Sequence, residues 1–473
     1  MAILASTACG KLEENSNGGG ATTYDQSVTT APEKLTDGLP DKNMEDFEFK
    51  ILHNPQKNLS WATVTLDAEA ENGDLVNDAI YKRNTAMEER FKCKITVEEE
   101  ANPHSNYASR VMSGDNTYDI IMVYGIEAMR LVDNYADINN IPHLKLDKQW
   151  WTPDATSVFE VGGKQVCAAG AFSISYASTA NCLLFNKRIY DEMKTGESLY
   201  NLVDSGKWTT DKLFEVAAGA VRDLNGDSKM DENDIWGING TAKAFHHMLV
   251  IGSGQHYVTK DKDGFPVFSA AKDEKLVSFF EKIVSLEKKD PYAYTSPTDV
   301  NNPANEIKFT DGKCLFEVNW GHQIASYRDM KDDFGIIPAP KYDEKQEKYY
   351  ANMANGEVMT LPRSYDENRL ENIGILLEAM SFYTYHEVMP VYKNELLQIK
   401  VARDDDSSRM LDIIFDGATY DFGINVWQNN LGNKIVSDIF ITKSDAIVST
   451  LTTLSNAVDG DIVKLRESIK AMP

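Results

Sequence analysis

Cysteine is scarce in this chain of 473 residues, where five occur, at positions 9, 93, 167, 182 and 314. They form no CxxC pair and do not cluster with histidine, which excludes a disulfide framework and a cysteine-based zinc site. Cys93, Cys167, Cys182 and Cys314 have apolar or β-prone neighbours. We therefore expect these four to be small buried hydrophobic residues.

Basic residues are also too few to balance the acidic ones, with 48 Lys and Arg against 73 Asp and Glu and a net charge of −25. This excess of negative charge repels phosphate backbones, so we expect no nucleic-acid partner. No apolar run approaches the roughly 20 residues that a membrane span requires. Hydrophobic residues make up 42% of the chain. At about 150 residues per domain, the length predicts about three domains or two large lobes.

Catalytic signatures are missing as well, because the sequence contains no GxSxG, no HExxH and no P-loop. His246, His247 and His256 lie close in sequence, but adjacent residues of a helix point to different faces, so we expect no metal role for them. Carboxylates are plentiful, yet no pair is placed as a glycosidase acid and nucleophile would be. The sequence therefore predicts no catalysis.

The N-terminus begins MAILASTAC, a short apolar stretch followed by small residues and Cys9. It resembles the end of a bacterial lipoprotein signal, in which the cysteine thiol receives a diacylglycerol. Only eight residues precede Cys9 and none is charged, so we interpret residues 1–9 as a truncated signal. Residues 10–45 are rich in Gly, Ser, Thr, Asn and charge, which predicts a flexible tether between a lipid anchor and the folded part.

Strand and helix patterns alternate along the rest of the chain. Phe47, Phe49 and Ile51 alternate with charged residues as in a strand, and Asp74 precedes apolar residues at helical spacing. Residues 118–125, YDIIMVYG, are typical of a strand that is buried on both faces. The same alternation returns after residue 181, and the final third is mostly helical. The pattern predicts an α/β protein.

Four stretches in the second half carry a more specific pattern: NCLLFNKRIYDEM (181–193), KWTTDKLFEVA (207–217), FTDGKCLFEVNWGHQIASYRDMKDDFGIIPAPK (309–341) and GEVMTLPRSYDENRLENIGILLEAMSF (356–382). Their order resembles that in the extracellular solute-binding proteins of bacterial ABC importers, in the group with the maltose-binding proteins. The resemblance implies a two-lobed periplasmic-binding-protein-like fold of type II. Each lobe is expected to be a mostly parallel sheet flanked by helices, with residues 46–178 and 355–405 in lobe 1 and residues 179–354 and 406–473 in lobe 2.

The resemblance also implies a function. Proteins of this family capture a solute in the cleft between the lobes, close about a hinge and deliver the solute to membrane permease subunits. We therefore expect a monomer anchored by its lipid at the extracytoplasmic face of the cell membrane, as on a Gram-positive cell surface. A carbohydrate or oligosaccharide is the expected solute. The alternatives are a binder of peptides or other polar solutes, and a cell-surface glycan adhesin or hydrolase of the same shape.

Candidate solute ligands are aromatic and polar residues that follow strands, because ligands of open α/β sheets bind beyond the carboxyl ends of the strands. These residues are Trp61, Tyr124, Tyr176, Trp320, Asn355, Glu357 and Trp427. Aromatic faces stack on sugar rings, and amide or carboxylate groups bond sugar hydroxyls, so the set suits a carbohydrate. Core packing is the alternative role for each aromatic residue.

One loop has the spacing of a calcium site. Residues 223–234 place oxygen-bearing side chains at loop positions one, three, five, nine and twelve, and a backbone carbonyl at position seven, as in an EF-hand. The predicted ligands are Asp223, Asn225, Asp227, Lys229, Asp231 and Asp234. The loop resembles the calcium loop of dockerins, although Ser228 occupies position six, where glycine is usual. We expect a structural Ca²⁺ site here, with an acidic surface loop as the alternative.

Overall fold

The structure is a computed structural model that describes residues 36–53, 66–100, 117–129, 132–295, 309–353, 356–363, 365–398 and 405–472, together with Asn106, Ser109, Arg110 and Ser113. The chain divides into two compact units, Met1–Thr36 and Asp37–Pro473. Within the described ranges, no helix combines the length and apolar character that a membrane crossing needs.

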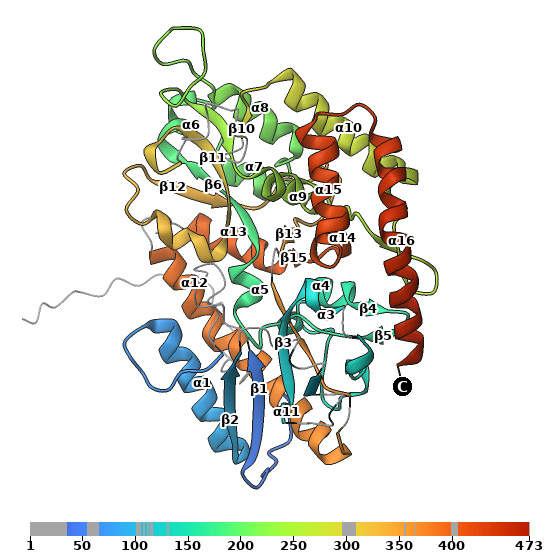
Figure 1. Cartoon of the computed structure of the whole chain (residues 1–473). Coiled ribbons are helices and arrows are strands. Elements are labelled where there is room, and N and C mark those ends of the chain that lie inside the picture. The colour runs from blue at the N-terminus through green and yellow to red at the C-terminus, as the bar shows by residue number, and fades with distance from the viewer. Residues whose placement is uncertain are drawn as a thin grey trace, which may run out of the picture. The chain divides into compact units, whose positions relative to one another are not determined.

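The first sheet contains four strands in the order β14 (Glu357–Thr360), β3 (Ile120–Tyr124), β1 (Phe47–His53) and β2 (Cys93–Glu99). β1 pairs in parallel with β2 and β3, whereas β14 runs antiparallel to β3. Phe49 and Ile51 are fully buried, as the alternation along this segment predicts. Figure 1 shows β1, β2 and β3 side by side, with α1 and α11 close to them.

The helices next to this sheet begin at capping residues. α1 (Leu75–Phe91) begins after Asp74, whose side chain accepts a hydrogen bond from the Asn77 N–H, and α11 (Glu367–Tyr383) begins in the same way after Asp366. Such caps satisfy a backbone donor that the first turn of a helix leaves unpaired. α11 continues through a π-helical turn, η8 (Thr384–Val388), into α12 (Met389–Gln398).

The second sheet contains β10 (Tyr294–Thr295), β7 (Trp236–Asn239), β11 (Cys314–Trp320), β6 (Asn181–Asn186) and β12 (Phe334–Ile337), in that order. β10, β7 and β11 are parallel, but β6 runs antiparallel to β11 and β12. The prediction of a mostly parallel sheet is therefore wrong for this sheet, which is mixed because β6 enters it in the opposite direction. At Gly335 a Cβ atom would lie 2.3 Å from the Tyr200 hydroxyl. Glycine is therefore required where β12 approaches this tyrosine.

The remaining elements are mostly helices. Around the second sheet they are α6 (Lys187–Met193), α7 (Leu199–Asp204), α8 (Thr210–Ala220), α9 (Ala242–Gly252) and α10 (Glu274–Lys289). The C-terminal part contains α13 (Asp405–Asp416), α14 (Phe422–Asn425), η9 (Gln428–Gly432), α15 (Asn433–Ile435), η10 (Val436–Ile441) and α16 (Ile447–Ala471). Shorter elements are α3 (Gly125–Ala128), η3 (Gln149–Trp151), α4 (Pro153–Val158), α5 (Ser175–Ser178), η7 (Gly321–Tyr327) and the paired strands β13 (Ala351–Asn352) and β15 (Ala418–Thr419).

The chain passes between the two sheets more than once. The first sheet takes strands from residues 47–124 and 357–360, and the second takes its strands from residues 181–337. The two passages between sheets therefore lie within residues 125–180 and 338–356. These passages agree with the predicted exchange of strands between lobes, while the exact lobe boundaries stay a prediction.

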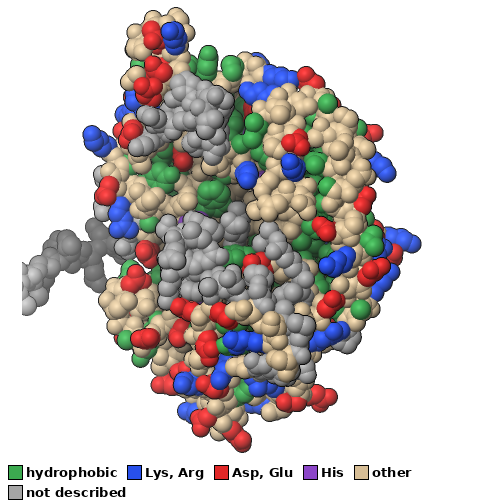
Figure 2. Space-filling view, in the orientation of Figure 1, with side chains coloured by type: hydrophobic (Ala, Val, Ile, Leu, Met, Phe, Trp, Pro, Cys, Tyr) green, Lys and Arg blue, Asp and Glu red, His purple; other side chains and the backbone are tan. Residues whose placement is uncertain are grey.

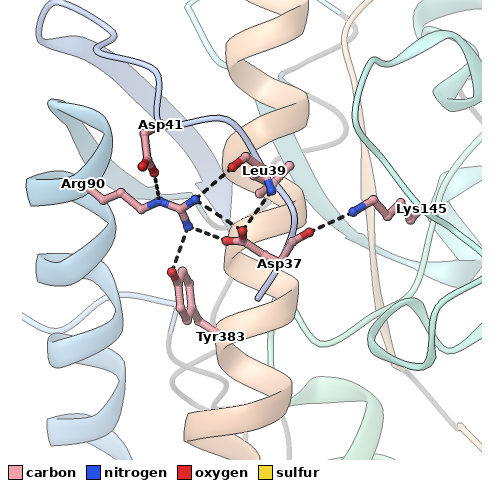
Figure 3. Close-up of polar contacts among 6 residues, drawn as sticks. All are labelled: Asp37, Leu39, Asp41, Arg90, Lys145 and Tyr383. Atoms are coloured by element: carbon pink, nitrogen blue, oxygen red, sulfur yellow. Dashed lines mark hydrogen bonds and ion pairs between the residues drawn. The ribbon is translucent and has the colours of Figure 1, made fainter. Parts of the chain in front are cut away.

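A network around Arg90 holds the start of the compact unit (Figure 3). The Arg90 guanidinium donates to the carboxylates of Asp37 and Asp41, to the Leu39 carbonyl and to the Tyr383 hydroxyl. Lys145 Nζ donates to the Asp37 carbonyl at 2.8 Å. Part of the predicted tether, residues 37–45, therefore belongs to the compact unit instead, because its apolar side chains and its carboxylates find partners there.

The four cysteines within the described residues lie in the core, as their neighbours in the sequence predict. Cys93, Cys167, Cys182 and Cys314 are free and buried, as predicted, and burial raises the pKa of each thiol. Charged side chains cover the outside, where acidic and basic groups are interspersed over the face shown in Figure 2.

Candidate functional site

The carboxyl edge of the first sheet brings three polar side chains together. His53 is the last residue of β1 and Tyr124 the last of β3, while Glu357 is the first residue of the antiparallel strand β14. Tyr124 and Glu357 are register partners. Strand ends of this kind are where α/β proteins bind ligands.

His53 and Glu357 form a buried pair. His53 Nε2 lies 2.7 Å from Glu357 Oε1, and the two side chains are 2% and 4% exposed. The Glu357 N–H donates to Ser175 Oγ at 3.0 Å, so both the backbone and the carboxylate of Glu357 are held. Glu357 Oε2 and the Tyr124 hydroxyl are buried without a hydrogen-bond partner among the described residues. This edge thus has a fixed acceptor and a hydroxyl group free for a ligand.

The Tyr124 hydroxyl stays protonated in this setting. Burial raises the pKa of Tyr124, and the nearby carboxylates of Glu357 and Glu127 raise it further. A protonated phenol both donates and accepts hydrogen bonds, which is what a sugar hydroxyl needs from its partner.

A second group lies at the end of β11, in the other sheet. The Trp320 and His322 rings are stacked, with centroids 6.4 Å apart and an interplanar angle of 18°. His322 Nδ1 donates to the Ser178 carbonyl at 2.8 Å, which leaves Nε2 as an acceptor, and burial lowers the pKa of His322. Trp320 Nε1 and His322 Nε2 are buried without partners within the described part of the chain.

The short helix α5 connects the two groups. Ser175 contacts Glu357 at its beginning, and Ser178 contacts His322 at its end. The Gly321 N–H also donates to the Ala180 carbonyl at 3.2 Å, so the start of η7 lies against the chain that follows α5. Glu357 and His322 therefore contact opposite ends of one helical turn.

Trp427 lies in a third place, between α14 and η9. It lines a cavity of about 580 Å³ together with Met129, Val132, Asp133, Val426, Asn429, Asn430, Asp461, Lys464, Leu465 and Ser468. Met129 follows Tyr124 by one turn beyond β3, so the cavity begins near the same end of the first sheet. The cavity is lined by an aromatic ring, amides and charged groups.

The structure thus brings some predicted ligands together and separates others. Tyr124 and Glu357 are neighbours. Trp320 lies on the other sheet, two residues before His322, which contacts the same helix, α5, as Glu357 does. Tyr176 is buried and lines a separate cavity. Trp61 and Asn355 lie outside the described residues. Sequence reasoning did not select His53 or His322, although His53 ends a strand as Tyr124 does and His322 follows Trp320 by two residues. Their position after strands was the available signal.

The predicted calcium loop is ordered by its own acidic side chains. Asp223 accepts hydrogen bonds from the backbone N–H groups of Gly226 and Ser228, and Asp234 accepts from Leu224 and Asp231. Ser228 has a φ of 65°, the left-handed conformation that glycine favours. Within the described residues, no group of three or more His, Cys, Asp or Glu is arranged to hold a metal. Calcium binding stays a prediction.

Comparison with solved structures shows the fold. The chain is similar to the cyclic α-maltosyl-1,6-maltose-binding protein of Arthrobacter globiformis, with 13% identity, 89% of this chain and 100% of that chain covered, and a TM-score of 0.56. For UspC of M. tuberculosis the values are 13%, 88%, 100% and 0.57. For an extracellular solute-binding protein of Staphylococcus aureus in complex with maltose they are 12%, 88%, 98% and 0.55. These similarities confirm the predicted two-lobed periplasmic-binding-protein fold.

The family follows from a second comparison. Among curated proteins nothing matches this chain. The family model for bacterial extracellular solute-binding proteins, however, matches residues 82–370, which is more than half of the chain and includes strands of both sheets. The chain therefore belongs to the bacterial extracellular solute-binding protein family, whose members bind solutes rather than transform them.

Proposed function

We propose that this protein captures a carbohydrate between its lobes and delivers it to the permease subunits of an ABC importer. The observation that carries the proposal is the set of buried, unused hydrogen-bonding atoms at the ends of β3, β14 and β11. The acceptors are Glu357 Oε2 and His322 Nε2, and the donors are Trp320 Nε1 and the Tyr124 hydroxyl. Sugars need donors, acceptors and an aromatic face at once.

Closure of the lobes couples binding of the solute to a change of conformation. A ligand shifts a two-state protein toward the closed form only by the difference between its affinities for the two forms. Here one group of candidate ligands lies on each sheet, and α5 joins the groups. A solute that contacts both groups binds the closed form more tightly, and this favours hinge closure.

The test is a thermal-shift screen with maltose, longer maltooligosaccharides, other glycans and peptides. A ligand at 100 times its Kd adds about 2.7 kcal/mol of stability, so a true ligand raises the Tm clearly. Recovery of the sugar unchanged after incubation supports binding without catalysis. A shift with peptides and with none of the glycans overturns the carbohydrate assignment, and accumulation of sugar products overturns the binding function.

We also propose that Cys9 carries the lipid that holds a monomer at the extracytoplasmic face of the cell membrane. Support comes from the small residues before Cys9 and from the polar composition of residues 10–36. Expression of the wild type and of Cys9→Ser in a bacterium fed a radiolabelled fatty acid tests this. Label on the wild type alone supports the anchor, and equal label on both proteins contradicts it.

The loop 223–234 is proposed to bind Ca²⁺ as a structural clip. The left-handed Ser228 at position six supports this, because an EF-hand loop makes its sharp turn there.

A further inference from the structure

A second cavity, of about 350 Å³, lies beside α5, and its lining contains none of Tyr124, Trp320 and Glu357. It is lined by Gln149, Thr152, Pro153, Asp154, Tyr176, Lys348, Tyr385, Phe415, Asp416 and Ala418. Lys348 comes from the segment between β12 and β13, and Thr152 lies between η3 and α4. The other residues come from η3, α4, α5, η8, the end of α13 and β15. Three of them are aromatic, so the cavity combines aromatic walls with a small number of polar groups.

Most charged and polar groups of this cavity are already paired with one another. Lys348 Nζ contacts Asp154 at 2.5 Å, and the Tyr385 hydroxyl bonds Gln149 Oε1 at 3.1 Å. Nearby, Lys393 contacts Asp412 at 2.5 Å. Each of these lysines therefore has its own carboxylate.

Asp416 is the exception. Its side chain is exposed at the cavity, and within the described residues no ion pair is formed by its carboxylate, although Lys348 and Lys393 lie near enough to lower its pKa. The surrounding charges are then Asp154, Asp412 and Asp416 against Lys348 and Lys393, which leaves one negative charge. Desolvation and repulsion by Asp412 raise the pKa of Asp416, and the attraction of Lys348 and Lys393 offsets only part of this rise. A bound cation would offset the remaining repulsion.

Two side chains that bear hydroxyl groups are also buried at this cavity. Tyr176 is 5% exposed and Thr152 is 6% exposed. Thr152 Oγ1 is buried without a partner in the described part of the chain, and it does not cap α4 although Thr152 precedes that helix. Thr152 also has a φ of 43°, a conformation that is strained for a β-branched residue. The surrounding structure holds this side chain at the cavity against its backbone preference.

We propose that this cavity is a second ligand site, and that it binds a small alkylammonium ion bearing a hydroxyl group. Aromatic faces attract an alkylammonium through their quadrupole, and the unpaired carboxylate of Asp416 supplies the counter-charge. Thr152 and Tyr176 supply partners for the hydroxyl. A neutral sugar fits less well, because the pairs described above consume the polar groups that its several hydroxyls would need.

The site is separate from the proposed carbohydrate site. Ser175 contacts Glu357, whereas the next residue, Tyr176, lines the cavity. Successive residues of a helix point about 100° apart, so one turn of α5 presents neighbouring residues to two different sites. The inference does not rest on the proposed sugar-binding function.

Isothermal titration of the full chain with choline and with 3,3-dimethylbutan-1-ol tests the proposal, because the alcohol has the same shape without the charge. We expect choline to bind at least tenfold more tightly than the alcohol. Equal binding of the two compounds, or no binding of choline up to about 10 mM, would overturn the proposal.

Two substitutions place the effect in this cavity. Asp416→Asn is expected to weaken choline binding at least tenfold, and Asp445→Asn, which removes the same charge from an exposed position, should change it less than twofold. Tyr176→Phe keeps the ring and removes one hydroxyl, so a loss of about threefold is expected. Circular dichroism and an unchanged Tm establish that each variant folds. Equal losses for Asp416→Asn and Asp445→Asn contradict the assignment.

Discussion

Glu378 is fully buried on α11 and accepts three hydrogen bonds. The donors are Trp150 Nε1 at 3.0 Å, Trp151 Nε1 at 2.6 Å and the Lys145 N–H at 3.1 Å. Trp151 is fully buried, and Trp150 is partly buried. Nothing in the sequence indicates this role of Glu378, because a carboxylate in a helical pattern has the same sequence signal whether it is exposed or buried.

Replacement of this carboxylate is expected to destabilise the fold. Glu378→Gln keeps the shape but turns one acceptor into a donor that faces an N–H group, which costs about 2 kcal/mol. Urea unfolding followed by tryptophan fluorescence measures the change. Glu367→Gln, at an exposed position of the same helix, is the control and should cost less than about 1 kcal/mol.

Glu317 on β11 predicts a dependence of stability on pH. Desolvation raises its pKa to about 8, although hydrogen bonds from Asn239 and Tyr327 oppose the shift. Between pH 4.5 and 8 the folded state keeps a proton that the unfolded state releases. The free energy of unfolding therefore falls as pH rises, by up to about 1.4 kcal/mol per pH unit, and levels off above the folded-state pKa.

The variant Glu317→Gln has no titrating carboxyl group at this position. Its unfolding free energy should therefore lack the part of the pH dependence that Glu317 contributes. Urea unfolding of both proteins from pH 5 to pH 9 measures it. We expect the difference in unfolding free energy between variant and wild type to grow in favour of the variant up to about pH 8. Parallel curves over the whole range would show that Glu317 ionises normally.

The proposed role of Trp320 predicts how its removal changes the affinity for the sugar. Removal of an aromatic face from a sugar site costs about 1.4 kcal/mol, so Trp320→Ala should raise the Kd for the sugar found by screening about tenfold. Tyr292→Ala, at a tyrosine that is 47% exposed, is the matched control and should leave the Kd unchanged. Equal affinities for wild type and Trp320→Ala would remove Trp320 from the site.

At the scale of elements, the sequence predicts most of the structure. The strands at residues 47 and 120 and the helix after Asp74 occur where their patterns indicate, and strands and helices alternate again after residue 181 as predicted. Hydrophobic period and capping residues are local signals, so they can be read from one segment. The contact of α5 with both sheets depends on residues more than 140 positions apart, and no local pattern contains it.

Also at the scale of elements, the loop at residues 223–234 predicts that calcium stabilises the fold. Removal of calcium with EGTA should lower the Tm of the wild type, because a ligand of the native state stabilises it. Asp223 also holds the loop backbone, so Asp223→Ala lowers the Tm with or without the metal. The informative quantity is the calcium-dependent part of the Tm, which this variant should lose. A wild type that does not respond to EGTA contradicts the site.

Ser228→Gly sharpens the same test. The left-handed φ of Ser228 is unstrained for glycine, so the variant should be more stable by up to about 1 kcal/mol and should bind calcium more tightly. Ser326→Gly is the control, because Ser326 lies in the exposed helical turn η7, where glycine destabilises.

At the scale of the whole molecule, the sequence predicts a two-lobed binding protein, and the family and the fold confirm it. The solute-contacting residues are less predictable, since they meet only after the chain has passed between the sheets. Tyr124 and Glu357 were selected because each stands at a strand end. The pairing of Glu357 with His53, 304 residues away, is a consequence of sheet order and could not be read from either segment.

The central claim is that a sugar closes the two lobes and leaves unchanged. Small-angle X-ray scattering of the protein alone and saturated with the sugar that raises its Tm most tests this directly. We predict a smaller radius of gyration in the saturated sample and full recovery of the sugar. Identical scattering curves at saturation, with binding established by calorimetry, would contradict the claim.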